Sequence, residues 1–263
     1  MIGNELTGMV PPSEPDFERL GRALTNAIRK IVPAGEKVGI AFSGGLDSGV
    51  LAWVAREGGM DIQLIVCGTA GSHDVSNAIA YAKDWGLSVS VETLTGETIR
   101  NDREQVKRIL QTEDRLQTML GGINLAMARR AHAEGLTHVI VGTGADAIFA
   151  GFFIFQKYRD DDRGCEQVRA EKMETLQGLD IPRENACARE YQINLHAPYM
   201  DPIFMEEALK ISAIRNLQGK YGPLRKGVLR ELAERMRVPE AIVRAPKKAM
   251  QYGSGVSKIV GGL

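Results

Sequence analysis

The sequence predicts an α/β protein in which a parallel β-sheet is covered by helices on both faces. Short β-rich apolar runs alternate with helical patterns up to about residue 142, and a glycine-containing turn joins the first run to the next helix. With 263 residues, of which 44% are hydrophobic, the chain is long enough to bury the core of such a fold. Ligands of these folds bind at the carboxyl ends of the strands, so we expect the functional residues there.

Apolar residues at helical spacing predict a first helix over residues 14–31, before the sheet begins. Strands and helices then alternate along the chain. The predicted strands are Lys37–Ser43, Asp61–Cys67, Leu87–Leu94 and Thr137–Gly142. The predicted helices between them are Leu46–Glu57, His73–Trp85 and a long polar helical region over Glu97–Glu134. This order is typical of consecutive β-α-β units, whose strands run parallel.

The alternation ends near residue 159, where the charged segment Arg159–Gly164 is typical of a solvated loop. The predicted helices after it are Glu166–Leu176, Glu184–Tyr191, Pro202–Ile211 and Pro223–Arg235. Asp201, directly before a proline at a helix start, is typical of an N-cap. We therefore expect an N-terminal extension over residues 1–15 and one domain over residues 16–263. The helical C-terminal portion of that domain begins at about residue 159 and packs against the sheet.

The composition limits the functions to consider. Lysine plus arginine equals aspartate plus glutamate, 33 against 33, so no net charge draws the chain to nucleic acid or anionic lipid. The sequence shows neither a bilayer-spanning apolar stretch nor a signal-peptide pattern, so we expect a cytoplasmic protein without a membrane partner. The sparse cysteines Cys67, Cys165 and Cys187 favour reduced, buried thiols. Joint ligation of zinc or an iron–sulfur cluster is the alternative for them.

The segment Ser43–Ser48, with the sequence Ser-Gly-Gly-Leu-Asp-Ser, follows the first predicted strand and opens the next helix. Its glycines let the backbone approach an anion closely, and the helix N-terminus presents N–H groups to it. The two serines add hydroxyl donors. Asp47 would repel phosphate, so an acid in this cradle indicates Mg²⁺ between the two. The alternative is an ordinary strand-to-helix turn.

Two further segments carry candidate chemistry. Gly142–Gly151 repeats the strand–glycine–helix pattern and places Asp146 in the first helical turn, where it could share Mg²⁺ with Asp47. The alternative for Asp146 is an acid favoured by the helix dipole alone. Arg244–Gly255 carries Lys247 in a segment without periodicity, which could close over a polyphosphate and neutralise leaving-group charge. Its alternative is a disordered basic tail.

These segments, in this order, resemble the synthetase domain of asparagine synthetases and of β-lactam synthetases, within the N-type ATP pyrophosphatases, or PP-loop family. Ser43–Ser48 is similar to the pyrophosphate loop, and Gly144–Gly151 is similar to the family segment Gly-(Ser/Ala)-Asp-Glu-x-Phe-x-Gly. The other similar segments are Gly71–Asp74, Ala197–Asp201, Lys226–Arg230, Pro239–Ile242 and Arg244–Gly255. The resemblance implies a five-stranded parallel sheet of the adenine nucleotide alpha hydrolase-like type.

The resemblance also implies ATP and Mg²⁺ as cofactors. The implied ATP-binding residues are Ala41, Ser43, Gly44, Gly45, Asp47, Ser48, Cys67, Gly142 and Lys247. Asp47 and Asp146 would ligate Mg²⁺ and, with Lys247, form the catalytic set. Lys247 would stabilise the pentavalent α-phosphorus and the departing pyrophosphate. The family reaction adenylates a substrate carboxylate, releases pyrophosphate and lets an amine attack the acyl-adenylate, so a small-molecule carboxylate is the expected substrate.

Two positions depart from the family pattern. Thr143 stands where asparagine synthetases have glutamate and β-lactam synthetases have tyrosine, and Ala147 replaces a second glutamate. A side chain that does not ionise cannot act as the general base for the incoming nitrogen, which argues against aspartate as the substrate but not against the handling of ATP.

No glutaminase domain is expected before this domain, so the nitrogen would come from free ammonia, a separate glutaminase or an amine on the substrate. A homo-oligomer is compatible with the sequence. Two other functions stay open. One is a PP-loop enzyme that adenylates a base in tRNA or another nucleic acid, against which the balanced charge and unclustered cysteines count. The other is a non-catalytic ATP-binding partner protein, which Thr143 and Ala147 favour.

Overall fold

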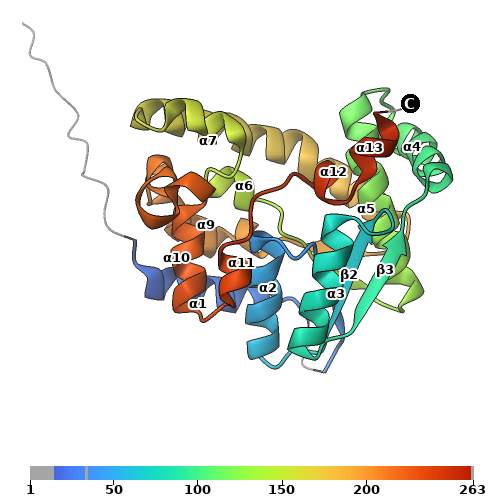
Figure 1. The fold of residues 1–263 in the computed structure, drawn as a ribbon, viewed down its shortest axis with the longest axis horizontal. Coiled ribbons are helices and arrows are strands. Elements are labelled where there is room, and N and C mark those ends of the chain that lie inside the picture. The colour runs from blue at the N-terminus through green and yellow to red at the C-terminus, as the bar shows by residue number, and fades with distance from the viewer. Residues whose placement is uncertain (1–14, 33–34, 262–263) are drawn as a thin grey trace, which may run out of the picture.

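The computed structural model describes residues 15–32 and 35–261, and it contains a five-stranded sheet at its centre (Figure 1). The strands are β1 Val38–Ala41, β2 Ile62–Gly68, β3 Val89–Thr93, β4 His138–Ile140 and β5 Asn194–His196. Their order across the sheet is β3-β2-β1-β4-β5, and every neighbouring pair is parallel. The predicted five-stranded parallel sheet with helices on both faces is confirmed.

The helices surround this sheet (Figure 1). The first five are α1 Phe17–Arg29, α2 Leu46–Glu57, α3 His73–Trp85, α4 Gly96–Leu110 and α5 Arg115–Ala133. The others are α6 Ala145–Ile148, α7 Asp162–Thr175, α8 Ile181–Arg189, α9 Pro202–Leu209, α10 Gly227–Arg235, α11 Glu240–Val243, α12 Met250–Gly253 and α13 Val256–Val260. Within the described residues, no helix is both long enough and apolar enough to cross a membrane.

Both faces of the sheet are buried, because alternate strand residues point into two separate cores. Val38, Ile40 and Leu64 belong to a core that they share with α1, α2, α3 and α10. Ile65 and Val139, which alternate with them, belong to a second core shared with α5, α8 and α13. The carboxyl ends of β1 and β4 therefore emerge between two fixed helical layers.

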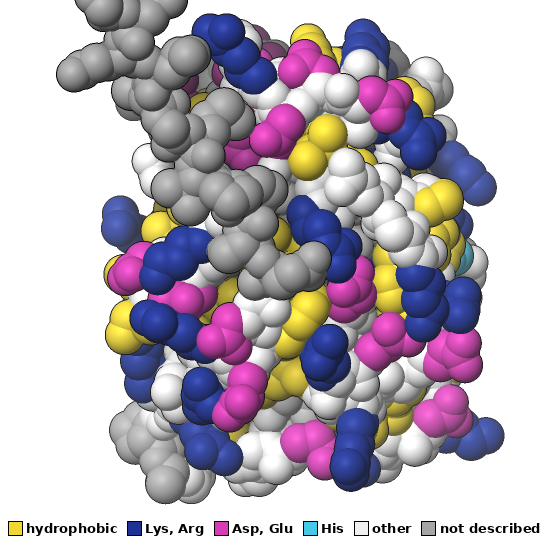
Figure 2. Space-filling model, turned by 90° about the vertical axis from the view of Figure 1, so that its left-hand side faces the viewer, with side chains coloured by type: hydrophobic (Ala, Val, Ile, Leu, Met, Phe, Trp, Pro, Cys, Tyr) yellow, Lys and Arg dark blue, Asp and Glu magenta, His cyan; other side chains and the backbone are white. Residues whose placement is uncertain are grey.

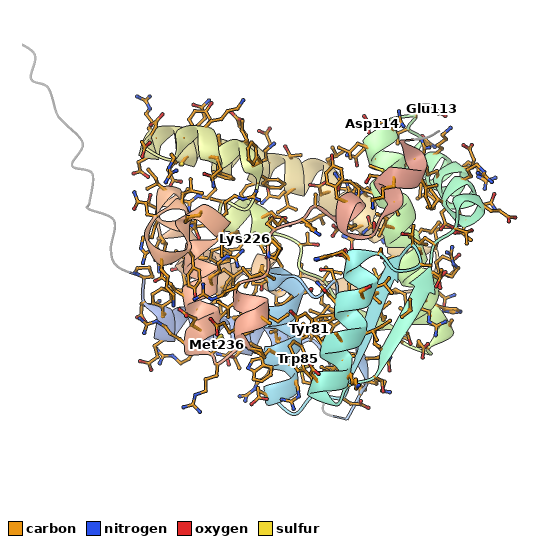
Figure 3. All side chains as sticks on the ribbon, viewed as in Figure 1. Tyr81, Trp85, Glu113, Asp114, Lys226 and Met236 are labelled. Atoms are coloured by element: carbon orange, nitrogen blue, oxygen red, sulfur yellow. The ribbon has the colours of Figure 1, made fainter. Side chains whose placement is uncertain are left out.

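Three elements illustrate how the structure differs from the sequence expectation. The predicted long helix ends at Gln111, whose φ is +49°, and α5 begins after Asp114, which accepts a 2.7 Å hydrogen bond from the amide of Gln117 (Figure 3). β5 pairs with β4 although the local pattern predicts no strand after residue 142. The predicted loop at residues 159–164 is partly helical, because the Asp161 side chain caps α7 by accepting from the amide of Gly164.

The N-cap expected at Asp201 is confirmed: its carboxylate accepts hydrogen bonds from the amides of Ile203 at 3.0 Å and Phe204 at 3.3 Å, with Pro202 opening α9. Residues 1–14 of the expected N-terminal extension lie outside the described residues. The domain limits of 16–263 stay a prediction.

Candidate active site

The loop between β1 and α2 is a tight turn at a helix N-terminus. Gly44 has φ of +72°, and a Cβ added there would lie 2.7 Å from Cβ of Asn77, so only glycine fits. The amide of Ser43 donates to Oγ of Ser48 at 3.2 Å, and the amide of Gly45 donates to Oγ of Ser43 at 3.3 Å. The hydroxyls thus hold the turn closed above the N-terminus of α2, where helix N–H groups favour an anion.

Aromatic packing fixes the start of this loop. The Phe42 ring lies 6.3 Å from the Tyr81 ring and 5.6 Å from the Trp85 ring, measured between centroids (Figure 3). Trp53 of α2 packs on Trp85 and donates from its indole nitrogen to the carbonyl of Met236 at 3.2 Å. The loop therefore begins on a rigid contact between α2 and α3.

Four charged side chains converge where β1 and β4 end, and we call Asp47, Asp146, Lys226 and Lys247 the four-charge cluster. Nζ of Lys226 lies 2.6 Å from both carboxylate oxygens of Asp47 and 2.7 Å from Oδ1 of Asp146. Nζ of Lys247 lies 2.6 Å from Oδ2 of Asp146 and 3.8 Å from Oδ2 of Asp47. Three of these residues were expected at the site, and the structure brings them together.

The cluster is electrostatically coupled. Burial acts to raise the pKa of Asp146, but the nearby Lys226 and Lys247 ammonium groups outweigh it and hold that pKa well below its usual range. Burial acts to lower the pKa of Lys247, but the carboxylates of Asp146 and Asp47 outweigh it and raise that pKa. Asp146 and Lys247 therefore carry opposite charges at neutral pH, where they face each other at 2.6 Å.

The two carboxylates of the cluster are also suited to bind a divalent cation. One ammonium nitrogen contacts both carboxylates, so Asp47 and Asp146 face a common point. Oδ1 of Asp146 is buried, and Nζ of Lys226 lies 2.7 Å from it. Carboxylate oxygens are ligands that Mg²⁺ prefers. The donor set therefore fits a shared Mg²⁺, which Asp47 and Asp146 would hold.

Lys226 was not expected at the site, and its position requires an unusual backbone. Arg225 has φ of +62° and ψ of 173°, and Lys226 has φ of +55°. Residues other than glycine rarely adopt such backbone conformations, and here two follow one another. Nη1 of Arg225 donates to the carbonyl of Gly151 at 2.5 Å, and Arg230 donates from Nε to the carbonyl of Arg225 at 2.8 Å. These contacts hold the turn so that Lys226, 1% exposed, reaches Asp47 and Asp146.

Little in the sequence indicates that Lys226 belongs to the site. The sequence match at Lys226–Arg230 identified the segment, but nothing in it indicated that this lysine faces Asp47 across 179 positions of sequence. Gly151 shows more clearly why Lys226 can reach Asp146. A Cβ added to Gly151 would lie 2.0 Å from Oδ1 of Asp146 and 2.2 Å from Cε of Lys226, so only glycine leaves room for their contact.

The residues expected around adenine lie at neighbouring strand ends. Ala41 ends β1, Cys67 lies near the end of β2 and Gly142 follows β4. Ala41 and Cys67 belong to the same face of the sheet. A Cβ added to Gly142 would lie 3.1 Å from Cβ of Asp47, so the segment after β4 packs closely against the first turn of α2. Their contact with a nucleotide stays a prediction.

The three cysteines are free and buried, in separate parts of the molecule. Burial raises the pKa of each thiol, to about 11 for Cys165 and about 12 for Cys187. Among the residues that the structure describes, no group of three or more His, Cys, Asp or Glu side chains could hold a metal ion. Because burial raises their pKa values, the thiols are protonated at neutral pH.

Sequence comparison identifies the family to which this site belongs. The family model described as asparagine synthase matches residues 19–171 and 160–263, nearly the whole chain. The chain belongs to the asparagine synthase family. All members of the four-charge cluster lie within the matched residues.

Relatives within the asparagine synthase family are similar over one part of their length. A Methanocaldococcus jannaschii protein assigned by name to the glutamine-hydrolysing asparagine synthetases is 29% identical over 279 residues, covering 92% of this chain and 50% of the relative. The glutamine-hydrolysing asparagine synthetase of Asparagus officinalis is 26% identical, covering 96% and 45%. Asparagine synthetase B of Escherichia coli is 22% identical, covering 93% and 46%. The chain spans about half the length of the relatives it matches.

Among solved structures, the NMN synthetase of Francisella tularensis is 15% identical with a TM-score of 0.46, covering 91% of this chain and 77% of that chain. This likeness is too distant to support a conclusion about fold or function.

Proposed function

We propose that this chain is an ATP-dependent ligase that forms AMP and pyrophosphate while it adenylates a small carboxylate for amide formation. The four-charge cluster beneath the Ser43–Ser48 loop is the observation that carries the proposal. Membership of the asparagine synthase family supports the same reaction class. The adenylation step, the substrate and each residue's role belong to the proposal.

In this proposal the loop amides and the hydroxyls of Ser43 and Ser48 bind the triphosphate, with Gly44 and Gly45 allowing its close approach. Asp47 and Asp146 hold Mg²⁺, which when bound neutralises charge on the phosphate oxygens. Adenine lies against the backbone at Ala41, Cys67 and Gly142, the ends of three adjacent strands.

The two lysines change partners when the nucleotide binds. Without it, Lys226 and Lys247 neutralise Asp47 and Asp146. Phosphate oxygens offer the lysines an alternative anion, which frees carboxylate oxygens for Mg²⁺. Lys247 then faces the α-phosphate and stabilises the departing pyrophosphate, an interaction that strengthens in the transition state.

For the carboxylate substrate and the nitrogen donor, we propose the chemical class and not the individual compound. The similar proteins are named as glutamine-hydrolysing enzymes. We propose an amine nucleophile for this chain, supplied as free ammonia, by a separate glutaminase or by the substrate itself. Assembly of two or more copies is compatible with this activity and is open to measurement.

A nucleic-acid substrate is the competing function considered from the sequence. Figure 2 shows lysine, arginine and acidic side chains interspersed over the face that it presents, rather than gathered by sign. The described side chains visible on that face do not form the single-sign surface that favours binding to a phosphate backbone. No observation favours the nucleic-acid reaction or a non-catalytic role over the ligase.

Carboxylate-dependent exchange of labelled pyrophosphate into ATP tests the proposal. We expect the wild-type chain with Mg²⁺ to show exchange with at least one member of a panel of small mono-, di- and amino-carboxylates. We expect Asp47→Asn to lose exchange by at least a hundredfold, because it removes one charge from the cation-binding pair.

The exposed Asp84→Asn, which also removes one carboxylate, and Cys165→Ser should both keep the wild-type rate. Exchange that survives Asp47→Asn, or a wild-type chain inert toward the whole panel, would contradict the proposed function.

A further inference from the structure

The two lysines of the four-charge cluster come from separate segments, and one arginine side chain binds both segments. Lys226 lies in the turn before α10, and Lys247 follows α11. Arg230, in the first turn of α10, is 0% exposed. On the Lys226 side, its Nε donates to the carbonyl of Arg225 at 2.8 Å and its Nη2 donates to the carbonyl of Leu224 at 3.2 Å. The turn that carries Lys226 is therefore held by a side chain of α10.

The same guanidinium binds the segment that carries Lys247. Nη2 of Arg230 donates to the carbonyl of Ala245 at 3.1 Å, and Nη1 donates to the carbonyl of Val243, the last residue of α11. Residues 245–249 belong to neither a helix nor a strand. The position of Lys247 therefore depends on how Arg230 holds the start of this stretch.

The shape and charge of the Arg230 side chain suit this linkage. A guanidinium carries five N–H groups in a fixed plane, whereas a lysine ammonium has three donors at one point and cannot span two segments. Burial lowers the pKa of Arg230 to about 10, and the Asp47 carboxylate opposes this effect. Arg230 therefore stays charged at neutral pH, while its hydrogen bonds to other described residues all go to main-chain carbonyls.

These contacts lie directly beside the two lysines in the chain. The Arg225 carbonyl belongs to the peptide bond that leads into Lys226, and Ala245 is separated from Lys247 by a single proline. The two ammonium groups contact the same Asp146 carboxylate, at 2.7 Å and 2.6 Å. A shift of one segment relative to the other would separate them, so the linkage affects the geometry of the cluster as well as the stability of the fold.

We propose that Arg230 is a positioning residue for adenylation, because it holds the ammonium groups of Lys226 and Lys247 at one spacing for the triphosphate. The inference rests on the proposed ligase function. Arg230 contacts no reacting atom in this role and acts through the two lysines, which meet the departing pyrophosphate together. Its replacement should therefore lower the rate of adenylation more than the affinity for ATP, which the Ser43–Ser48 loop binds.

Acetylation of the chain without nucleotide tests the geometry itself. Arg230→Lys keeps the charge, but the four carbonyls are no longer bound together. With limiting acetic anhydride and peptide mass spectrometry, the ratio of the Lys247 rate to the Lys248 rate should rise about tenfold, because Lys247 loses the pairing with Asp146 that raises its pKa. Lys248 is exposed and is the internal reference.

Arg169→Lys is the matched control. Arg169 is also a buried arginine that donates to main-chain carbonyls, those of Ile211 at 2.7 Å and Leu209 at 3.4 Å, outside the four-charge cluster. Its acetylation ratio should match the wild type within about twofold, because the two sites share no partner. Circular dichroism reports the folded state of both variants.

Pyrophosphate exchange then measures the effect of the linkage on adenylation. With the carboxylate that supports exchange by the wild-type chain, Arg230→Lys should lower kcat by about 10²-fold, as expected for misplaced groups, and should change KM for ATP by less than about threefold. Arg169→Lys should keep both constants near the wild-type values.

An unchanged acetylation ratio in Arg230→Lys, or an equal rise in Arg169→Lys, would overturn the inference. A higher KM for ATP without a fall in kcat would also overturn it, and so would the loss of the folded state by Arg230→Lys alone, because these results assign Arg230 to binding or to stability. Absence of exchange in the wild-type chain, with the acetylation ratios as expected, would instead reject the proposed ligase and leave the linkage between the two segments in place.

Discussion

Two features of Lys226 are energetically unfavourable for folding: its ammonium group is almost fully buried, and its backbone is left-handed. Both are offset where the ammonium contacts Asp47 and Asp146. Removing one partner of a buried charge group typically costs about 3–5 kcal/mol, because the remaining charges stay desolvated. Lys226 therefore holds two like-charged side chains together, beyond any role toward a nucleotide.

We expect Lys226→Met to lower the free energy of unfolding by about 3 kcal/mol without divalent cations, because Asp47 and Asp146 lose their shared counter-ion. Millimolar Mg²⁺ should restore a measurable part of this loss, since the two carboxylates then take the cation. Denaturant unfolding of the variant and the wild type, with and without Mg²⁺, measures both effects.

Lys220→Met is the control for this comparison. Lys220 is exposed and pairs with Glu234 at 2.6 Å on the surface, so its loss should cost far less than the loss of Lys226. Mg²⁺ should not change that cost. Equal Mg²⁺ responses of the two variants would show that the carboxylates of the cluster do not act as a cation site.

At the scale of elements, short stretches of helix and turn position the site. Asp201 caps α9 directly after a turn whose Tyr199 hydroxyl donates to the carbonyl of Asp47 at 2.9 Å. The cap therefore stabilises an element that contacts the site. Burial raises the pKa of Asp201, but Lys30 and the amides of Ile203 and Phe204 outweigh it and lower that pKa.

We expect Asp201→Ala to lower the free energy of unfolding by about 1–2 kcal/mol at pH 7, the usual cost of losing an N-cap. The lowered pKa means that the carboxylate stabilises the folded state above its unfolded pKa, and this contribution disappears as pH falls through the folded value below 3.8. The difference between variant and wild type should therefore shrink in acid.

Unfolding titrations at pH 7 and pH 3 measure this difference. Asp160→Ala, an exposed acid that caps no helix, should have little effect at either pH. A variant difference that is the same at both pH values would contradict the assignment to the ionised carboxylate.

How far the sequence predicts an element depends on whether its ends are marked locally. His73–Trp85 is helical as predicted, because Gly86 ends it in the left-handed conformation that glycine favours. The break at Gln111 carries no such mark, since a glutamine adopts the same conformation there. Three-residue β5 has no periodicity of its own and exists because β4 offers it hydrogen bonds.

At the scale of the whole molecule, the parallel sheet explains which site residues were predictable. Asp47 and Asp146 follow adjacent parallel strands, so fold class alone brings them to one edge. Lys226 reaches that edge from the turn before α10, which no local pattern connects to it. Tertiary packing decided its position, and the roles proposed for the predicted residues stay predictions.

A ligand that bridges the two strand ends and the C-terminal segment should stabilise the whole fold. At 100 times its dissociation constant, ATP with Mg²⁺ should contribute about 2.7 kcal/mol, a rise of about 5–10 °C in the melting temperature. Differential scanning calorimetry with a non-hydrolysable ATP analogue measures the shift. Asp47→Asn should show a much smaller shift, and an unchanged wild-type melting temperature would contradict nucleotide binding.

The turn at Arg225 and Lys226 has a consequence for protein engineering. Glycine is the residue that relieves left-handed strain, so a search for thermostabilising substitutions would select both positions. Glycine at 226 removes the ammonium itself, and glycine at 225 removes the guanidinium that anchors the turn to the carbonyl of Gly151. At 226 the loss of the buried ammonium would therefore offset the relief of strain, and at 225 the relief would come at the expense of the geometry of the cluster.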